Sequence, residues 1–254
     1  MPDGVTEDRF LDGRVLVGQP VRTARAGIDA VLLAAAVPVV AGGSQSVLDV
    51  GSGTGVVSLL IAHHSETARI TGVEADPGLV ALAIKNADRN GFGGRVTFIH
   101  SDILEPSEGL SALGLSPETF DIAVSNPPFF ARRHGTVPAT AQRARAHVMP
   151  EPGLAAWLDF MTRVTKQKGQ IALIHRAEAL PEILIGLDRR FGDIRVLPLH
   201  PKPGQPANRV IVIGTRNARG PFKLLPGFVL HHADGSFRDE ATAILRHGAR
   251  LPLF

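Results

Sequence analysis

The sequence predicts an α/β protein built on a mostly parallel sheet with helices on both faces. Three observations support this fold class. Predicted strands alternate with predicted helices from Val47 to His175, which is typical of a parallel sheet. The first strand of that series runs through a glycine-rich turn directly into a helix. The two closing strands are separated only by a Pro/Gly-rich loop, so we expect them to pair antiparallel.

The elements follow from apolar patterning and from the turn residues between them. An N-terminal strand is predicted over 14–18, followed by a helix over 30–40 that Asp29 can cap. A tail with a turn at Asp234-Gly235 ends in a short helix from Arg238. We expect one domain over 1–254, in which 46–216 is the core, 1–45 an extension and 217–254 a packed tail. Core strands are predicted over 46–50, 69–74, 96–99, 120–125, 170–175, 193–199 and 209–215, and core helices over 56–63, 77–90, 153–164 and 177–189.

The composition excludes several classes of site. The chain contains no Cys, so disulfides and thiolate metal sites are impossible and a reducing, cytoplasmic setting is expected. The ten His residues have no metal-ligand spacing. No apolar run is long enough to span a bilayer, and no leader opens the chain, so we expect a soluble protein without a metal. A net charge of +3 is too small to indicate a nucleic-acid partner, although arginines cluster over 132–145.

A ligand crevice is predicted where consecutive strands end in polar residues. The turn Gly51-Ser-Gly-Thr-Gly55 can bring backbone amides close to a ligand at a helix N-terminus, but dinucleotide oxidoreductases share this feature. Glu74 follows Gly51 by 23 residues and is placed to bind ribose hydroxyls. Because the carboxyl ends of parallel strands meet at one edge, we expect four groups in one crevice: Asp49, Glu74, Asp102 and Asn126.

The fourth of these strands breaks at Asn126-Pro127-Pro128-Phe129. Two prolines cannot donate to a sheet ladder, so the chain leaves the sheet at Asn126. The stretch presents a carboxamide, a fixed carbonyl and an aromatic ring in succession. These groups suit a planar, amino-bearing acceptor such as a nucleobase or a side-chain amide.

Residues 26–216 resemble the class I S-adenosylmethionine-dependent methyltransferases. The resemblance implies a Rossmann-like sheet of seven strands with an antiparallel last strand, and S-adenosyl-L-methionine as cofactor. It implies that Asp49 and the turn cradle the methionine part, that Glu74 binds both ribose hydroxyls, and that Asp102 binds the adenine amino group. The implied cofactor-binding residues are Asp49, Gly51, Gly53, Gly55, Glu74, Ala75, Asp102, Ile103 and Asn126.

The Asn126 stretch resembles the (N/D/S)-P-P-(Y/F/W) motif of methyltransferases that act on planar nitrogens. Its implied catalytic residues are Asn126, Pro127, Pro128 and Phe129. The Asn126 side chain and the Pro127 carbonyl would accept hydrogen bonds from the amine and aim its lone pair at the methyl group. Phe129 would stack on the base, which stabilises such complexes by about 1–3 kcal/mol. No strong general base is needed, because the nitrogen acidifies once it is alkylated.

Nearly the whole chain resembles the bacterial tRNA(Val) adenine-37 N6-methyltransferase family. The similar segments are Gln19-Pro20, 26–33, 126–130, the arginine-rich stretch after it, and the tail over 230–246. The resemblance implies methylation of adenine N6 in tRNA, with the anticodon stem-loop as partner. Arg132, Arg133, Arg143 and Arg145 would contact phosphates beside an extruded base.

Three alternatives remain open from the sequence. A guanine N2-methyltransferase of ribosomal RNA shares the Asn-Pro-Pro-Phe stretch. A glutamine N5-methyltransferase of release factors shares Asn-Pro-Pro, but residues 1–45 are too short for the helical N-terminal domain of those enzymes. A non-catalytic RNA-binding module on the same fold would have no need to aim an amine.

Overall fold

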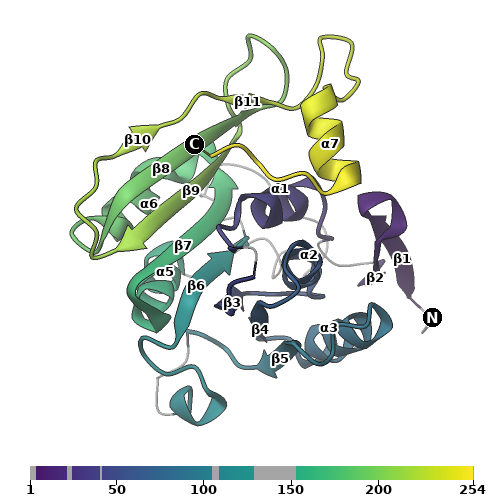
Figure 1. Ribbon diagram of the computed structural model, residues 1–254, viewed down its shortest axis with the longest axis vertical. Helices are drawn as coiled ribbons and strands as arrows, with labels where there is room; N and C mark the ends of the chain where they lie inside the picture. The colour runs from purple at the N-terminus through teal and green to yellow at the C-terminus, as the bar shows by residue number, and fades with distance from the viewer. Residues whose placement is uncertain (1–3, 22–24, 41, 105–108, 129–152, 254) are drawn as a thin grey trace, which may run out of the picture.

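The structure is a computed structural model that describes residues 4–21, 25–40, 42–104, 109–128 and 153–253. A single large sheet runs through the molecule (Figure 1), with strand order β10-β8-β9-β7-β6-β3-β4-β5 and with β11 also paired to β8. Every neighbouring pair is parallel except β7 with β9 and β8 with β9. The longer strands are β3 (Ser46–Val50), β4 (Arg69–Glu74), β5 (Val96–His100), β6 (Phe120–Ser125), β7 (Thr165–Arg176), β8 (Phe191–His200) and β9 (Arg209–Arg216).

In the described part of the chain the sheet has nine strands, so the predicted number of seven is wrong. The two additional strands, β10 (Lys223–Leu224) and β11 (Phe228–Val229), are two residues long and pair with the edge strand β8. An edge strand presents unpaired backbone groups, which the tail satisfies as it runs alongside. The predicted antiparallel closing strand is confirmed: β9 lies between β7 and β8 and is antiparallel to both.

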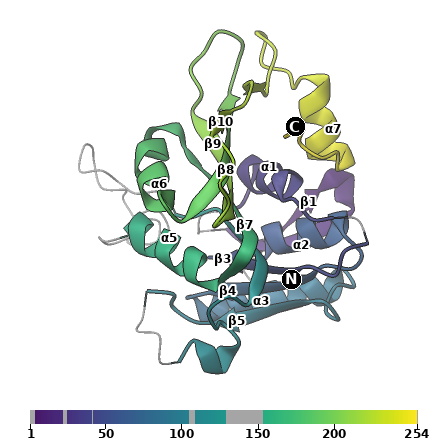
Figure 2. The same cartoon turned by 60° about the vertical axis from the view of Figure 1, so that its left-hand side comes forward.

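Two hydrophobic cores lie on opposite faces of the sheet. Successive side chains of β6 alternate between them, with Ile122 and Val124 in one core and Ala123 in the other. The helix layers lie on either side of the sheet in Figure 2. The first core is covered by α1 (Ile28–Ala36), α2 (Val56–His64), α3 (Pro77–Arg89) and α7 (Asp239–His247), and the second by α5 (Gly153–Val164) and α6 (Leu180–Leu187).

Some predicted boundaries differ from the structure. Asp29 does not cap α1: the cap position is Gly27, and the Asp29 carboxylate instead pairs with the Arg209 guanidinium at 3.0 Å. The stretch 166–169, which the predicted bounds leave between a helix over 153–164 and a strand over 170–175, lies inside β7. It forms an irregularity in the pairing of β7 with β6 that includes Lys168 at φ +61°. Single 3-10 turns occur over Leu11–Gly13, Ser111–Leu113 and Ala177–Ala179, the last replacing the start of the helix predicted from 177.

An N-terminal hairpin packs beside the core. The strand predicted over 14–18 is β2 (Val15–Pro20), and the sequence did not predict its partner β1 (Val5–Phe10). Asn86 of α3 accepts from the Gly18 amide at 2.8 Å and donates to the carbonyls of Gly18 and Thr54 at 3.1 and 2.9 Å. The buried Asn86 carboxamide therefore ties the hairpin to the glycine-rich turn.

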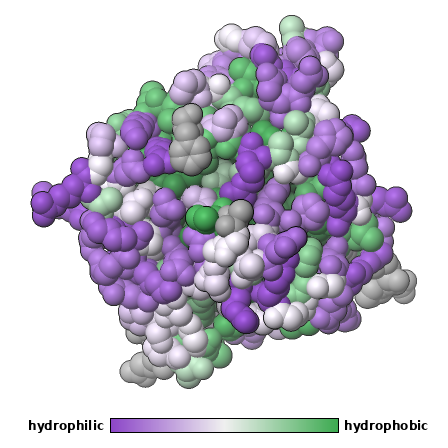
Figure 3. Space-filling model, viewed as in Figure 1, coloured by the Kyte–Doolittle hydropathy of each residue, from purple (hydrophilic) through white to green (hydrophobic). Residues whose placement is uncertain are grey.

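The surface is largely polar, as expected for a chain whose apolar residues are buried in the core. Most of the face seen in Figure 3 is hydrophilic, and its hydrophobic areas are scattered. Within the described residues, no helix combines the length and the apolarity needed to cross a membrane.

Candidate active site

The register of the sheet brings the four predicted strand ends level with one another. Val50 at the end of β3 pairs with Ser125 of β6 on one side and with Val73 of β4 on the other. Glu74 in turn pairs with His100 of β5. Neighbouring strands lie about 4.8 Å apart, so the predicted site spans about 14 Å from the end of β6 to the end of β5.

The glycine-rich turn needs glycine for two separate reasons. Gly51, Gly53 and Gly55 have φ values of +72°, +55° and +85°, a region that other residues rarely adopt. A Cβ atom at Gly51 would lie 2.8 Å from the Trp157 ring, and one at Gly55 would lie 2.6 Å from the Phe98 ring. At Gly53 no atom lies within 4 Å of such a Cβ, so the turn is open to a ligand there.

The Glu74 carboxylate is held beside this turn. Its Oε2 accepts from the Gly53 amide at 2.9 Å, and its Oε1 accepts from the Asp76 amide at 3.0 Å. Asp76 caps α3, accepting from the amides of Gly78 and Leu79. With both oxygens fixed by backbone amides, Glu74 is oriented before any ligand arrives, and each oxygen keeps a further lone pair.

Asp49 lies beneath the turn and is buried. Its Oδ2 accepts from the amide and the hydroxyl of Ser58 at 3.1 and 2.7 Å, so it satisfies an amide in the first turn of α2. Burial raises the pKa of Asp49 to about 7, with a smaller increase from the nearby Glu74 charge, while the bonds from Ser58 oppose the shift. A cationic group at the turn would favour the ionised form.

The far rim of the site carries Ala75, Asp102 and Ile103. Asp102 is exposed, and its Oδ1 accepts from the Leu104 amide at 2.9 Å. Ile103 is half-buried and packs against the second core, which leaves part of its side chain available to a flat ligand. The carbonyl of the exposed Ala75 lies 3.0 Å from Nε2 of His100.

The acceptor side begins where β6 ends. Asn126 and Pro128 are half-buried and Pro127 is buried. Ser125, directly before them, is fully buried; its hydroxyl donates to the Val50 carbonyl and accepts from the Trp157 indole, both at 2.8 Å. The remaining predicted site residues, Phe129, Arg132, Arg133, Arg143 and Arg145, lie outside the described residues.

Three residues that contact the site were not predicted as part of it. Ser125 links two strand ends, and the rings of Trp157 and Phe98 press against the glycine turn. The only sequence signal is that Trp157 is the single tryptophan of the chain. Across the described ranges, no group of three or more His, Asp or Glu residues is arranged to hold a metal ion.

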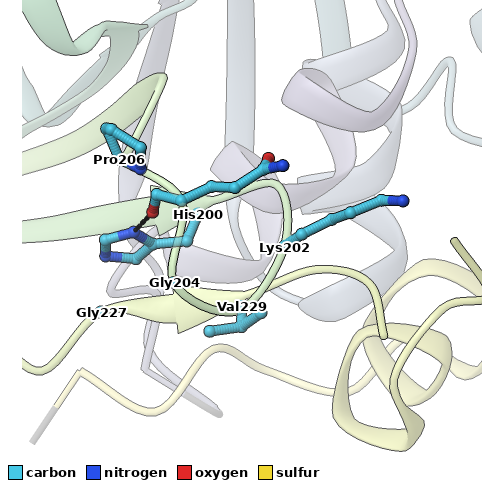
Figure 4. A pocket seen from close by; sticks show the side chains of 7 residues that line it. His200, Lys202, Gly204, Pro206, Gly227 and Val229 are labelled. Carbon is cyan, nitrogen blue, oxygen red and sulfur yellow. Dashed lines mark hydrogen bonds between the residues drawn. The ribbon is translucent and has the colours of Figure 1, made fainter. Parts of the chain in front are cut away.

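A shallow hollow of about 480 Å³ lies elsewhere, at the loop between β8 and β9 (Figure 4). Its walls come from that loop and from β11, with the His200 ring bonded through Nδ1 to the Gln205 carbonyl at 2.8 Å. β8 is separated from β6 by β9 and β7, so the hollow is distinct from the predicted site.

The chain is similar to known methyltransferases along most of its length. Residues 43–188 match a family model described as a methyltransferase domain. A tRNA1(Val) (adenine(37)-N6)-methyltransferase of Porphyromonas gingivalis is 30% identical, over 92% of this chain and 91% of its own. The enzyme of that name from Aeromonas hydrophila is 32% identical over 85% and 86%. A release factor glutamine methyltransferase of Geobacter sulfurreducens is 39% identical, but over only 34% of this chain and 27% of its own.

Solved structures share the fold. A protein from Agrobacterium tumefaciens, described as a predicted O-methyltransferase, superposes with a TM-score of 0.73 at 22% identity, over 88% of this chain and 98% of its own. Pyrococcus horikoshii TYW2 in complex with MeSAdo superposes with a TM-score of 0.52 at 14% identity, over 85% and 73%.

Proposed function

We infer that this chain, which belongs to the tRNA1(Val) (adenine(37)-N6)-methyltransferase family, transfers a methyl group from S-adenosylmethionine to the exocyclic N6 of an adenine in tRNA. This inference depends on one observation: the strand ends that would bind the cofactor lie level with the strand end that would bind the acceptor base. The glycine turn and Glu74 end the strands β3 and β4, and Asn126-Pro127 ends β6 beside them.

The part of the site that would bind the methyl donor, called the donor half, is formed by residues 49–55 and Glu74 and by Asp102 and Ile103. Its residues fit the chemistry of S-adenosylmethionine. Two carboxylates, Asp49 and Glu74, meet at a glycine turn that is open at Gly53. A carboxylate held by backbone amides, as Glu74 is, suits a pair of ribose hydroxyls. We propose that Asp49 faces the cationic methionine part, and that Asp102 and Ile103 hold the adenine. When bound, the cofactor supplies an electrophilic methyl group on a sulfonium.

We propose that the acceptor half works by positioning. The Asn126 carboxamide and the Pro127 carbonyl accept the two hydrogens of the amine, which directs the lone pair away from the base plane. The nitrogen would gain the methyl group as the carbon–sulfur bond of the sulfonium breaks, which leaves a neutral thioether, and the alkylated nitrogen would then lose a proton to solvent. Catalysis of this kind comes from orientation and fixed dipoles rather than from a strong base. Pro128 fixes the chain direction after Pro127, and we propose that Phe129 stacks on the base.

A further set of residues, the arginines over 132–145, would bind the RNA and so bring the adenine to the site. We propose that Arg132, Arg133, Arg143 and Arg145 contact phosphates of the anticodon stem-loop, because they follow directly on the acceptor stretch in the sequence. We also propose that residues 1–254 act as one domain in the cytoplasm. The Asn86 bonds to the hairpin and the packing of α7 against the first core support the one-domain reading.

The experiment that tests this function is labelling with methyl-labelled S-adenosylmethionine and total tRNA, followed by nucleoside analysis. We expect label in N6-methyladenosine. Label in N2-methylguanosine, or in glutamine of a release factor offered in a parallel reaction, would overturn the assignment. The same reaction with Asn126→Ala is the control for activity carried by contaminants.

A further inference from the structure

Trp157 contacts both halves of the site from beneath. Its ring lies against the glycine turn, where a Cβ atom on Gly51 would be 2.8 and 2.9 Å from Cζ2 and Cη2. Its Nε1–H donates to the hydroxyl of Ser125 at 2.8 Å. The residue is only 7% exposed and lies in the second core, which α5 and α6 cover. One indole therefore touches Gly51, the first residue of the glycine-rich turn 51–55 (the donor turn), and Ser125, the last residue of β6.

The hydroxyl of Ser125 extends this contact into a chain of two hydrogen bonds, called the relay below. It donates to the Val50 carbonyl at 2.8 Å, so the bonds run from the indole on α5, through β6, to β3. Ser125 has no exposed surface. A buried polar chain in which each member is satisfied is stiff, since losing one member leaves a buried partner with one bond fewer.

The relay lies at the point where the two halves diverge. Val50 and Ser125 are the last paired residues of β3 and β6. The next residues are Gly51, which opens the cofactor turn, and Asn126, which opens the acceptor stretch. Beyond this pair the sheet ladder no longer fixes the distance between the two chains, and the Ser125 hydroxyl adds one more bond between the strands there.

We propose that Trp157 is a positioning residue which, through Ser125, sets Asn126 against the donor turn. The proposal rests on the function proposed above. Trp157 touches no reacting atom; it acts on the alignment of the acceptor amine with the methyl group. Alignment is the main source of rate in this site, and a misplacement of 1 Å can cost a factor of about 100.

The test uses two variants that each break the relay. Trp157→Phe keeps a ring against Gly51 and removes the N–H donor. Ser125→Ala removes the hydroxyl that both bonds share. We expect each to lower the single-turnover rate of methyl transfer by about 10- to 100-fold, with the dissociation constant for S-adenosylhomocysteine changed by no more than about twofold. The double variant should be no slower than the slower single variant, because both changes remove the same relay.

Thr162→Val is the matched control. Thr162 is buried on the same helix and its hydroxyl donates to the Leu158 carbonyl at 2.7 Å, a bond of similar length that does not reach the site. We expect its transfer rate to equal that of the parent protein, even with a comparable loss of melting temperature. Parental rates in both relay variants would overturn the proposal. Rates that fall only in proportion to cofactor affinity, or to the same extent as in Thr162→Val, would also overturn it.

Fluorescence gives a readout that does not depend on the acceptor. Trp157 is the only tryptophan and the chain has no tyrosine, so the emission reports this one indole. We expect saturating S-adenosylhomocysteine to change the emission of the parent and of Thr162→Val equally. Ser125→Ala should emit at shorter wavelength before any addition, since its indole N–H has lost its acceptor. If neither S-adenosylhomocysteine nor the Ser125→Ala substitution changed the emission, the contacts of Trp157 with Gly51 and Ser125 would be contradicted.

Failure of the proposed function can be distinguished from failure of the proposal about Trp157. If the parent protein labels guanine or glutamine instead of adenine, that function fails, and the transfer rates of the variants are compared on the acceptor that is labelled. If the parent labels no acceptor, the function fails as well, and the two fluorescence measurements decide whether Trp157 couples Ser125 to the donor turn.

Discussion

Glu74 and Gly53 are joined by a hydrogen bond of 2.9 Å from the backbone amide of the turn to Oε2 of the carboxylate. The acid that would bind the ribose is thus fixed by the turn that would bind the methionine part. In the proposed site this bond would couple cofactor recognition to the conformation of Gly53, which has a positive φ of +55°.

Replacing Glu74 should therefore weaken cofactor binding strongly. We expect Glu74→Ala to reduce the affinity for S-adenosylhomocysteine by about 2–4 kcal/mol, the loss of charge-assisted bonds to two hydroxyls. Glu74→Gln should lose less, because one acceptor oxygen remains. Isothermal calorimetry measures both, and Glu66→Ala, an exposed acid outside the site, is the control. Unchanged affinity in Glu74→Ala would remove this residue from the cofactor site.

Replacing Asn126 should separate binding from chemistry. We expect Asn126→Ala to abolish detectable methyl transfer while cofactor affinity stays near the parental value, because in the proposed mechanism the carboxamide acts on the acceptor amine. Rapid-quench measurements with saturating tRNA and labelled cofactor would report the transfer step. Substantial residual transfer in this variant would refute the positioning role.

Cofactor affinity should rise with pH through about 7. Burial raises the pKa of Asp49 from 3.8 to about 7, so the free protein keeps this group largely protonated below neutrality. A cationic ligand favours the ionised form, so binding releases a proton, and affinity falls by up to about tenfold per pH unit below 7. Calorimetry at pH 6, 7 and 8, in buffers of different ionisation enthalpy, measures both effects. Asp49→Asn should bind weakly at every pH.

The same shift has the opposite consequence for stability. The folded state holds the Asp49 proton between pH 3.8 and about 7, whereas the unfolded chain has already released it. The contribution of Asp49 to stability therefore falls as pH rises across this range. We expect Asp49→Asn to remove that dependence, so that its melting temperature gains on the parent as pH increases from 4 to 7. Parallel pH profiles would contradict this.

Asn86 should be important for stability as well as for the site. Asn86→Ala leaves the buried Gly18 amide without its acceptor and removes two further bonds, for which we expect a loss of about 3 kcal/mol in the free energy of unfolding. Urea denaturation measures it. The Asp29–Arg209 pair is the comparison: it is partly exposed, so Asp29→Ala should cost no more than about 1 kcal/mol.

The arginine-rich stretch should determine how RNA binding depends on salt. Replacing Arg143 and Arg145 together by Ala should flatten the plot of log affinity against log salt concentration, because two fewer phosphates are neutralised. Filter binding or fluorescence anisotropy with tRNA over a salt series would measure the slope. A slope equal to that of the parent would show that these arginines make no phosphate contact.

Much of the fold was predictable from local patterns. Strands β3, β4 and β6 and helix α5 have the predicted bounds, because each is a short apolar run that ends at Gly, Pro or a polar residue. Strands β1, β10 and β11 were not predicted. They are short or largely polar, and they form because a neighbouring strand offers free backbone groups. The cap at Asp29 was wrong because α1 begins at Ile28, two residues before the predicted start, so that Asp29 lies inside the first turn. Its carboxylate pairs there with Arg209, 180 residues away.

The sequence by itself determined the order of strands and helices, the glycine turn and the polar residue at each strand end, because all of these depend on neighbours along the chain. Only the tertiary structure decided how those ends are held. Trp157 meets Ser125 across 32 residues, and Ser125 meets Val50 across 75. Such bonds depend on how a helix packs against a finished sheet, and no local pattern specifies that packing. The strand ends come from sequence; their rigid alignment comes from the packed core beneath them.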